Sequence, residues 1–245
     1  MAKVIALLYG IAAYMLFFVV FLYSIGFVGN WLVPKSIDSG TEGSLVPSLL
    51  INAILLGVFA VQHSVMARPG FKRWWTQLVP KPIERSTYVL LSSLALALLF
   101  WQWQPLQGVV WDVKNSAGTL VLWTLFWAGW LIVLTSTFLI NHFDLFGLRQ
   151  VYLNLRGEKY TNVSFKILGL YKLVRHPIML GFVIAFWAAP HMTVGHLVFA
   201  VATTVYILIA LQLEEQDLVT YIGDAYKQYK KQVPMLLPFP RRKQD

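Results

Sequence analysis

The 245-residue chain contains no cysteine. Disulfides, thiolate metal sites and a covalent cysteine intermediate are therefore excluded. Charge is also scarce, because charged residues make up 13% of the chain and the 11 acidic residues face 20 basic ones. With 58% hydrophobic residues and a mean hydropathy of +0.62, the composition lies far outside the range of soluble domains. It indicates an integral membrane protein.

Long apolar runs predict an all-α fold, a bundle of five to six transmembrane helices. The expected helices cover about residues 4–33, 45–67, 88–103, 119–140, 178–190 and 196–213. Four or five of them approach or exceed the ~20 residues that span a bilayer. The segment 178–190 is too short to cross unaided. Pro190 should end it and His191 to Gly195 should form the turn, giving a C-terminal helical hairpin.

The basic residues predict the orientation. All of them except Lys35 and Lys114 fall on one side of a six-crossing topology. Both termini and the basic loops are therefore expected to be cytoplasmic. The net charge of +9 then reflects topology and contact with anionic membrane lipids, and no nucleic-acid partner is expected.

No linker or repeat divides the chain, so we expect a single domain over residues 1–245. Its main cytoplasmic elaboration should be Asn141 to Leu173, and Tyr221 to Asp245 should form a tail. The first apolar run lacks a short core that ends in a small-residue cleavage site, so it is expected to be a retained helix.

Two charged clusters flank the predicted hairpin. Arg175 and His176 precede it, and Glu214 and Glu215 follow it. Charges beside apolar helices are costly and usually functional. A cationic and an anionic cluster at one membrane edge would suit a zwitterionic ligand. Pro177 in a first helical turn leaves nearby amides free for an anion.

The stretch Gly169 to Pro177, with Gly181 and Glu214-Glu215, resembles the membrane methyltransferases related to isoprenylcysteine carboxyl methyltransferase. The tail from Gly223 to Tyr229, followed by Val233-Pro234, extends the resemblance. It implies a cytoplasmic region over about 169–234 that binds S-adenosylmethionine. The cofactor-binding residues it implies are Tyr171, Arg175, His176, Pro177, Met179, Gly181, Glu214, Glu215, Tyr226 and Tyr229. Many relatives carry tyrosine at the position of Met179.

The charges of S-adenosylmethionine match these residue types. Arg175 and helix-start amides can take its carboxylate, and Glu214 or Glu215 can take a positive or ribose group. The tyrosines could pack against adenine or face the sulfonium. Each piece alone also has a structural interpretation, as an interfacial anchor, a solvated helix end or a packing stripe. Gly181 would let a ligand approach the backbone.

Two further polar clusters end the second and fourth predicted helices, Gln62 to Arg68 and Asn141 to Gln150. Both resemble the bacterial methanethiol S-methyltransferases, a branch close to the NnrU-type membrane proteins, and this resemblance runs from about Asn52 onward. It implies methyl transfer from S-adenosylmethionine to methanethiol, giving dimethyl sulfide. It also implies a bacterial inner membrane, with the active site on the cytoplasmic side.

A small alkanethiol has a pKa well above the ~8.5 of cysteine, so the site must remove its proton or stabilise the thiolate. His142 with Asp144, or His63, could accept the proton, and Arg149 or Arg68 could favour the anion. Gln62, Arg68 and Gln150 are the expected substrate contacts. Alignment of the two sulfurs and the methyl group would supply the remaining acceleration. The five histidines lack tight ligand spacing, so no metal is expected.

Two other functions remain open from the sequence. The same cofactor could methylate a lipid, an isoprenoid carboxylate or another small thiol. Alternatively, the chain could be a non-catalytic NnrU-type membrane protein that supports nitrogen-oxide metabolism. The last hypothesis predicts weak or no binding of S-adenosylmethionine.

Overall fold

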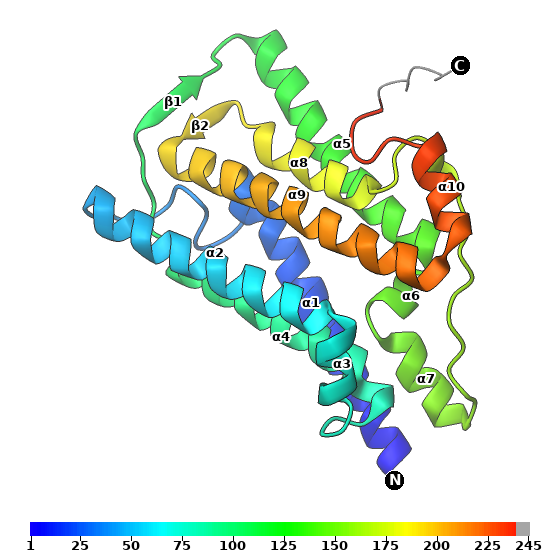
Figure 1. The fold of residues 1–245 in the computed structure, drawn as a ribbon. Coiled ribbons are helices and arrows are strands. Elements are labelled where there is room, and N and C mark those ends of the chain that lie inside the picture. Colours follow the sequence, from blue (N-terminus) through cyan, green and yellow to red (C-terminus); the bar gives the residue numbers. More distant parts are fainter. Residues whose placement is uncertain (239–245) are drawn as a thin grey trace. The chain divides into compact units, whose positions relative to one another are not determined.

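The protein is an all-α integral membrane protein, and the computed structural model describes residues 1–238 (Figure 1). Arg241, Arg242 and Lys243 of the expected tail lie outside the described residues. The chain forms two compact units. Unit 1 comprises Met1–Val109, Asn141–Val163 and Thr193–His196. Unit 2 comprises Val110–Ile140, Ser164–Met192 and the described residues from Leu197 onward. The single domain expected over 1–245 stays a prediction.

Unit 1 is built around the helix Lys81–Gln102, which contacts three other helices of the unit. Its elements are α1 (Ala2–Gly29), α2 (Leu45–Ala67), α3 (Pro69–Trp75), α4 (Lys81–Gln102), α6 (His142–Leu145) and α7 (Leu148–Arg156). Helix α4 packs against α1, α2 and α7. Met66, Tyr88 and Val89 form a buried cluster between α2 and α4, and Phe17 of α1 packs on it.

The remaining elements lie mostly in unit 2. They are β1 (Val109–Asp112), α5 (Ser116–Ile140), the 3-10 helix η1 (Gly169–Lys172), α8 (Pro177–Trp187), β2 (His191–Thr193), α9 (Val194–Ile222) and α10 (Asp224–Gln232). Val109 of β1, Thr193 of β2 and the first three residues of α9 belong to unit 1. Helix α8 packs against α5. It also contacts α9 through a hydrogen bond in which Trp187 Nε1 donates to Thr204 Oγ1 at 2.9 Å.

The prediction of an all-α integral membrane protein is confirmed. Helices α1, α2, α4, α5 and α9 are each long and apolar enough to cross a membrane, and α8 is a shorter apolar helix. The sidedness of the bundle stays a prediction.

Several predicted element limits were wrong. Helix α1 ends at Gly29 instead of residue 33, because Asn30 adopts a left-handed conformation (φ 58°). Helix α4 begins at Lys81 instead of residue 88, since its first turn carries Pro82 and Glu84, both favourable there. Helix α8 spans Pro177–Trp187 and not 178–190.

The expected turn after the short helix is partly a strand. His191–Thr193 forms β2, which pairs with β1, a strand that the sequence analysis missed. Helix α9 continues to Ile222 instead of ending at residue 213, and Gly223 with φ 74° follows it. Glu214 and Glu215 therefore lie inside a helix and have helical neighbours on both sides.

The crossing of α5 and α8 depends on two glycines. A Cβ at Gly181 would lie 2.6 Å from the carbonyl oxygen of Gly129, and one at Gly129 would lie 2.7 Å from that of Gly181. Both obstructing atoms are backbone atoms, which cannot rotate away. Small residues thus let the two helix backbones approach closely, as membrane helices commonly do.

Gly181→Ala is expected to destabilise unit 2 by about 1–3 kcal/mol through overpacking. Thermal unfolding in detergent would measure this. Gly57→Ala is the matched control, since a Cβ at Gly57 meets nothing within 4 Å and alanine favours a helix. Equal stability of the two variants would contradict a packing role for Gly181.

Candidate functional site

The first cluster begins where α8 starts in unit 2. Pro177 is the first residue of this helix, a position where its missing N–H costs nothing. Arg175 and His176 directly precede it, and both are buried, with 5% and 8% of their surfaces exposed. A buried guanidinium requires partners.

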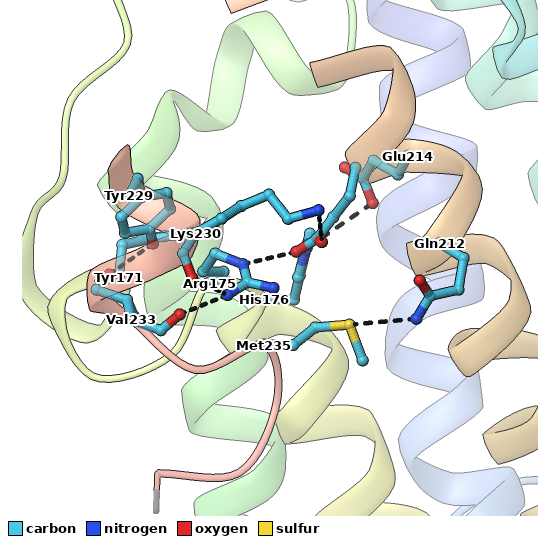
Figure 2. Close-up of polar contacts among 10 residues, drawn as sticks. Tyr171, Arg175, His176, Gln212, Glu214, Tyr229, Lys230, Val233 and Met235 are labelled. Atoms are coloured by element: carbon cyan, nitrogen blue, oxygen red, sulfur yellow. Dashed lines mark hydrogen bonds and ion pairs between the residues drawn. The ribbon is translucent and has the colours of Figure 1, made fainter. Parts of the chain in front are cut away.

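Arg175 bonds groups of its own unit through two of its guanidinium nitrogens (Figure 2). Its Nε donates to Glu215 Oε1 at 2.6 Å. Its Nη1 donates to the backbone carbonyls of Lys230, at 3.2 Å, and Val233. The guanidinium therefore joins α9 to the end of α10.

The segment after α10 is fastened to the same place through its backbone. The amide of Arg175 donates to the carbonyl of Pro234 at 2.9 Å, and that of His176 to Met235 at 3.2 Å. Met235 also receives a contact from Gln212 of α9, whose Nε2 lies 3.7 Å from its sulfur (Figure 2). The start of α8 is thus covered by the chain itself.

The two adjacent glutamates of α9 have different environments. Glu215 is buried, with 3% of its side chain exposed, and contacts Arg175, Lys230 Nζ at 2.7 Å and His176 Nε2 at 3.2 Å. Glu214 has 47% of its side chain exposed, and its Oε2 lies 3.9 Å from His176 Nδ1. Glu215 therefore serves the internal network, and Glu214 offers an accessible carboxylate beside it.

The three tyrosines of the predicted cofactor region pack together. Tyr226 and Tyr229 are buried with Val233, and Tyr229 donates to the carbonyl of Tyr171 at 2.6 Å. Tyr171 donates in turn to Ser136 O at 3.4 Å. Burial raises the pKa of Tyr229 to about 12 and also raises the pKa values of Tyr171 and Tyr226. These hydroxyls are neutral donors at physiological pH, and stacking on adenine stays a prediction.

Met179 and Gly181 follow on α8. Met179 is partly buried, and the open side of Gly181 is filled by α5. Their contact with a ligand stays a prediction.

The sequence analysis missed Lys230. This lysine lies one helical turn beyond Tyr226 on α10, a spacing that could have placed it on the same face. Its side chain is 37% exposed, and its ammonium pairs with the buried Glu215. It brings a second cation to the cluster of Arg175, Glu214 and Glu215.

The predicted acceptor residues lie in unit 1. His142 is the first residue of α6 and is 6% exposed. Tyr14 of α1 places its hydroxyl 2.9 Å from His142 Nε2. Burial lowers the pKa of His142, so its imidazole is neutral and able to accept a proton at physiological pH.

Asp144 and Arg149 pair with each other. Arg149 Nη1 donates to Asp144 Oδ1 at 2.9 Å and to the carbonyl of Thr161 at 2.7 Å. Tyr160 donates to the other oxygen of Asp144 at 3.2 Å. Gly147, with φ 89°, sets the turn between α6 and α7, and a Cβ there would strike Ser86 of α4.

His63 forms a second histidine–tyrosine pair. Its Nε2 lies 2.8 Å from the hydroxyl of Tyr88, and its Nδ1 lies 3.2 Å from Ser92 Oγ. Phe59 stacks on the imidazole at 5.2 Å between ring centroids. Both candidate bases are therefore oriented by a phenol.

The predicted substrate contacts are only partly engaged. Gln62 donates to Met66 Sδ at 3.1 Å, and Gln150 donates to Asp144 O at 3.1 Å. Within residues 1–238, the buried Oε1 atoms of both glutamines have no hydrogen-bond partner. Arg68 Nε donates to Ser64 O at 3.3 Å. The two amide oxygens are acceptors that a donor such as S–H could satisfy.

An open surface hollow of about 400 Å³ lies in unit 1 beside Arg149. Its lining residues are Leu7, Asn141, Phe143, Leu148, Arg149 and Tyr152. Among the described residues, no group of three or more histidine, cysteine or acidic side chains could hold a metal ion.

Comparison with known proteins gives full-length relatives. The family described as NnrU protein matches residues 49–231. A Mycobacterium tuberculosis protein named methanethiol S-methyltransferase is 58% identical over 99% of both chains. The Bradyrhizobium diazoefficiens protein named methanethiol S-methyltransferase 1 is 59% identical over 98% of this chain and 84% of its own.

A more distant relative comes from an animal. Nurim of Mus musculus is 30% identical over 72% of this chain and 70% of its own length. No solved structure matches the chain.

Proposed function

The chain belongs to the NnrU protein family, and from that membership we propose that it methylates methanethiol to dimethyl sulfide with S-adenosylmethionine as the methyl donor. The observation that carries the proposal is the 58% identity, over 99% of both chains, to a relative named methanethiol S-methyltransferase. Identity at this level over the full length of both chains supports a shared reaction.

The donor fits the charges found in unit 2. S-adenosylmethionine supplies a methyl group on a sulfonium and carries a carboxylate, an ammonium and ribose hydroxyls. The accessible carboxylate of Glu214 suits a cationic or hydroxyl group, and the partly exposed ammonium of Lys230 suits a carboxylate. Arg175 and Glu215 are already paired, so we propose that they position Glu214, His176 and Lys230 for the donor.

Thiolate formation is assigned to unit 1. His142 accepts the proton of the thiol, because burial keeps its imidazole neutral and Tyr14 fixes its orientation. The electron pair of the thiolate sulfur forms the new carbon–sulfur bond, and the electrons of the broken sulfonium bond remain on the leaving sulfur. Gln62 and Gln150 orient the acceptor through their buried amide oxygens.

Calorimetry and headspace gas chromatography test the proposal. Purified protein should bind S-adenosylmethionine, and addition of methanethiol should yield dimethyl sulfide. Absence of donor binding would reject a methyltransferase function altogether. Donor binding without dimethyl sulfide would reject methanethiol as the acceptor and favour a lipid or another thiol.

The membrane location suits this acceptor. Methanethiol is small and apolar, so it partitions into lipid as well as water. We propose that the enzyme works in the inner membrane of a bacterium with its site facing the cytoplasm. The excess of lysine and arginine on one side of the predicted topology supports this orientation.

A further inference from the structure

Arg85 contacts Tyr88 of one histidine–tyrosine pair of unit 1 and the helix that carries His142 of the other, although nothing in the sequence distinguished it from other interfacial arginines. It lies in the second turn of α4 and is partly buried. Its Nε donates to the carbonyl of Leu145 at 2.8 Å, which ties α4 to the helix that carries His142 and Asp144.

The same guanidinium also reaches the other pair. Its Cζ lies 5.2 Å from the centroid of the Tyr88 ring, and the hydroxyl of Tyr88 lies 2.8 Å from His63 Nε2. Its field extends to Tyr160: burial and Asp144 raise the pKa of this phenol, whereas Arg149 and Arg85 act in the opposite direction. One cation therefore contacts the tyrosine of one candidate base and the helix that carries the other.

The charge of Arg85 is not neutralised by a carboxylate in residues 1–238. Its contacts there are a backbone carbonyl and an aromatic ring. Arg149 and Arg175 are each paired with a carboxylate, Asp144 and Glu215 respectively. A partly buried guanidinium without a carboxylate partner keeps its charge available to an anion nearby.

We propose that Arg85 stabilises the thiolate form of the acceptor by its charge and positions α6 through Leu145. This inference rests on the proposed thiol methylation and assigns a residue to its least favourable step. Away from bulk water, a nearby cation favours ionisation of a thiol much more than it would in water.

Other ionisable groups surround Arg85 and contribute to any pH dependence. On its own helix they include Glu84 and Tyr88, and on the elements packed against α4 they include Tyr14 of α1, His63 of α2, His142 and Asp144 of α6, Arg149 of α7 and Tyr160. All of these remain in an Arg85 variant, so a change in the profile of that variant reports on the guanidinium.

The test is the pH dependence of kcat for dimethyl sulfide formation in Arg85→Gln, Arg85→Lys and the control Arg73→Gln. Arg73 is an exposed arginine on α3 of the same unit. Loss of the charge in Arg85→Gln should shift the acidic limb of the pH profile to higher pH by about one to two units. Turnover at neutral pH should fall about 10- to 100-fold, with the affinity for S-adenosylmethionine unchanged.

Arg85→Lys keeps the charge but loses the guanidinium that donates to the carbonyl of Leu145. The acidic limb of its pH profile should therefore stay near that of the wild type, while kcat falls. Arg73→Gln should leave the position of the acidic limb and the value of kcat unchanged. A uniform fall in kcat across pH for Arg85→Gln would show a structural role or a lipid anchor and overturn the proposal. If Arg85→Gln does not fold, Arg85→Lys decides the question. A shift of its acidic limb to higher pH, although the charge is kept, would overturn the proposal. Wild-type protein that forms no dimethyl sulfide would instead reject the proposed function.

Discussion

Glu215→Ala is expected to destabilise the protein and abolish donor binding, whereas Glu214→Ala should weaken donor binding alone. Glu215 is 3% exposed and neutralises Arg175 and Lys230, so its removal leaves a buried guanidinium without its carboxylate. Breaking such a pair costs about 3–5 kcal/mol. The expected readouts are a lower unfolding temperature and faster tryptic cleavage at Lys230 and Lys231.

Glu214 is the matched control, because it is the same residue type one position earlier in α9. Its side chain is 47% exposed, so no unfolding penalty is expected. Loss of a charged hydrogen bond to the donor should reduce affinity by about 10- to 100-fold in calorimetry. If both variants bind the donor with wild-type affinity, the cluster in unit 2 does not hold it.

His142→Ala is expected to lower kcat by about 10²–10³-fold and to leave donor affinity unchanged, since general-base catalysis commonly contributes this much. Steady-state kinetics with methanethiol, together with donor calorimetry, would separate the two quantities. Tyr14→Phe removes the hydroxyl 2.9 Å from His142 Nε2 and should cause a much smaller loss. His191→Ala, at an exposed histidine of unit 2, should have no effect.

The opposite order would reassign the base. If His63→Ala lowers kcat more than His142→Ala, the pair formed by His63 and Tyr88 accepts the proton. A loss of donor affinity in His142→Ala would argue for a structural role of this histidine.

The membrane fold could be predicted from the sequence because burial in lipid requires long apolar runs, and these can be read directly. The limits of the helices could not be predicted in the same way. Helix α9 continues through Glu214 and Glu215, where the sequence is polar and an apolar run no longer indicates a helix. Strand β2 was missed because three residues carry no periodic pattern.

The predicted charged residues of the donor cluster could be found because guanidinium and carboxylate groups are conspicuous beside apolar helices. Their pairing could not be predicted, because it depends on the fold of α10 and on the carbonyls of Lys230 and Val233. Lys230 and Arg85 were missed for a related reason. Each looks like an ordinary interfacial cation until its neighbours in space are known.

Transfer of an isotopically labelled methyl group tests the central claim most directly. Purified enzyme would receive S-adenosylmethionine with a deuterated methyl group and unlabelled methanethiol, and headspace mass spectrometry would measure the product. The account predicts dimethyl sulfide that carries one deuterated and one ordinary methyl group, with strongly reduced yield in Glu215→Ala and His142→Ala. Absence of the mixed product, or undiminished yield in both variants, would contradict it.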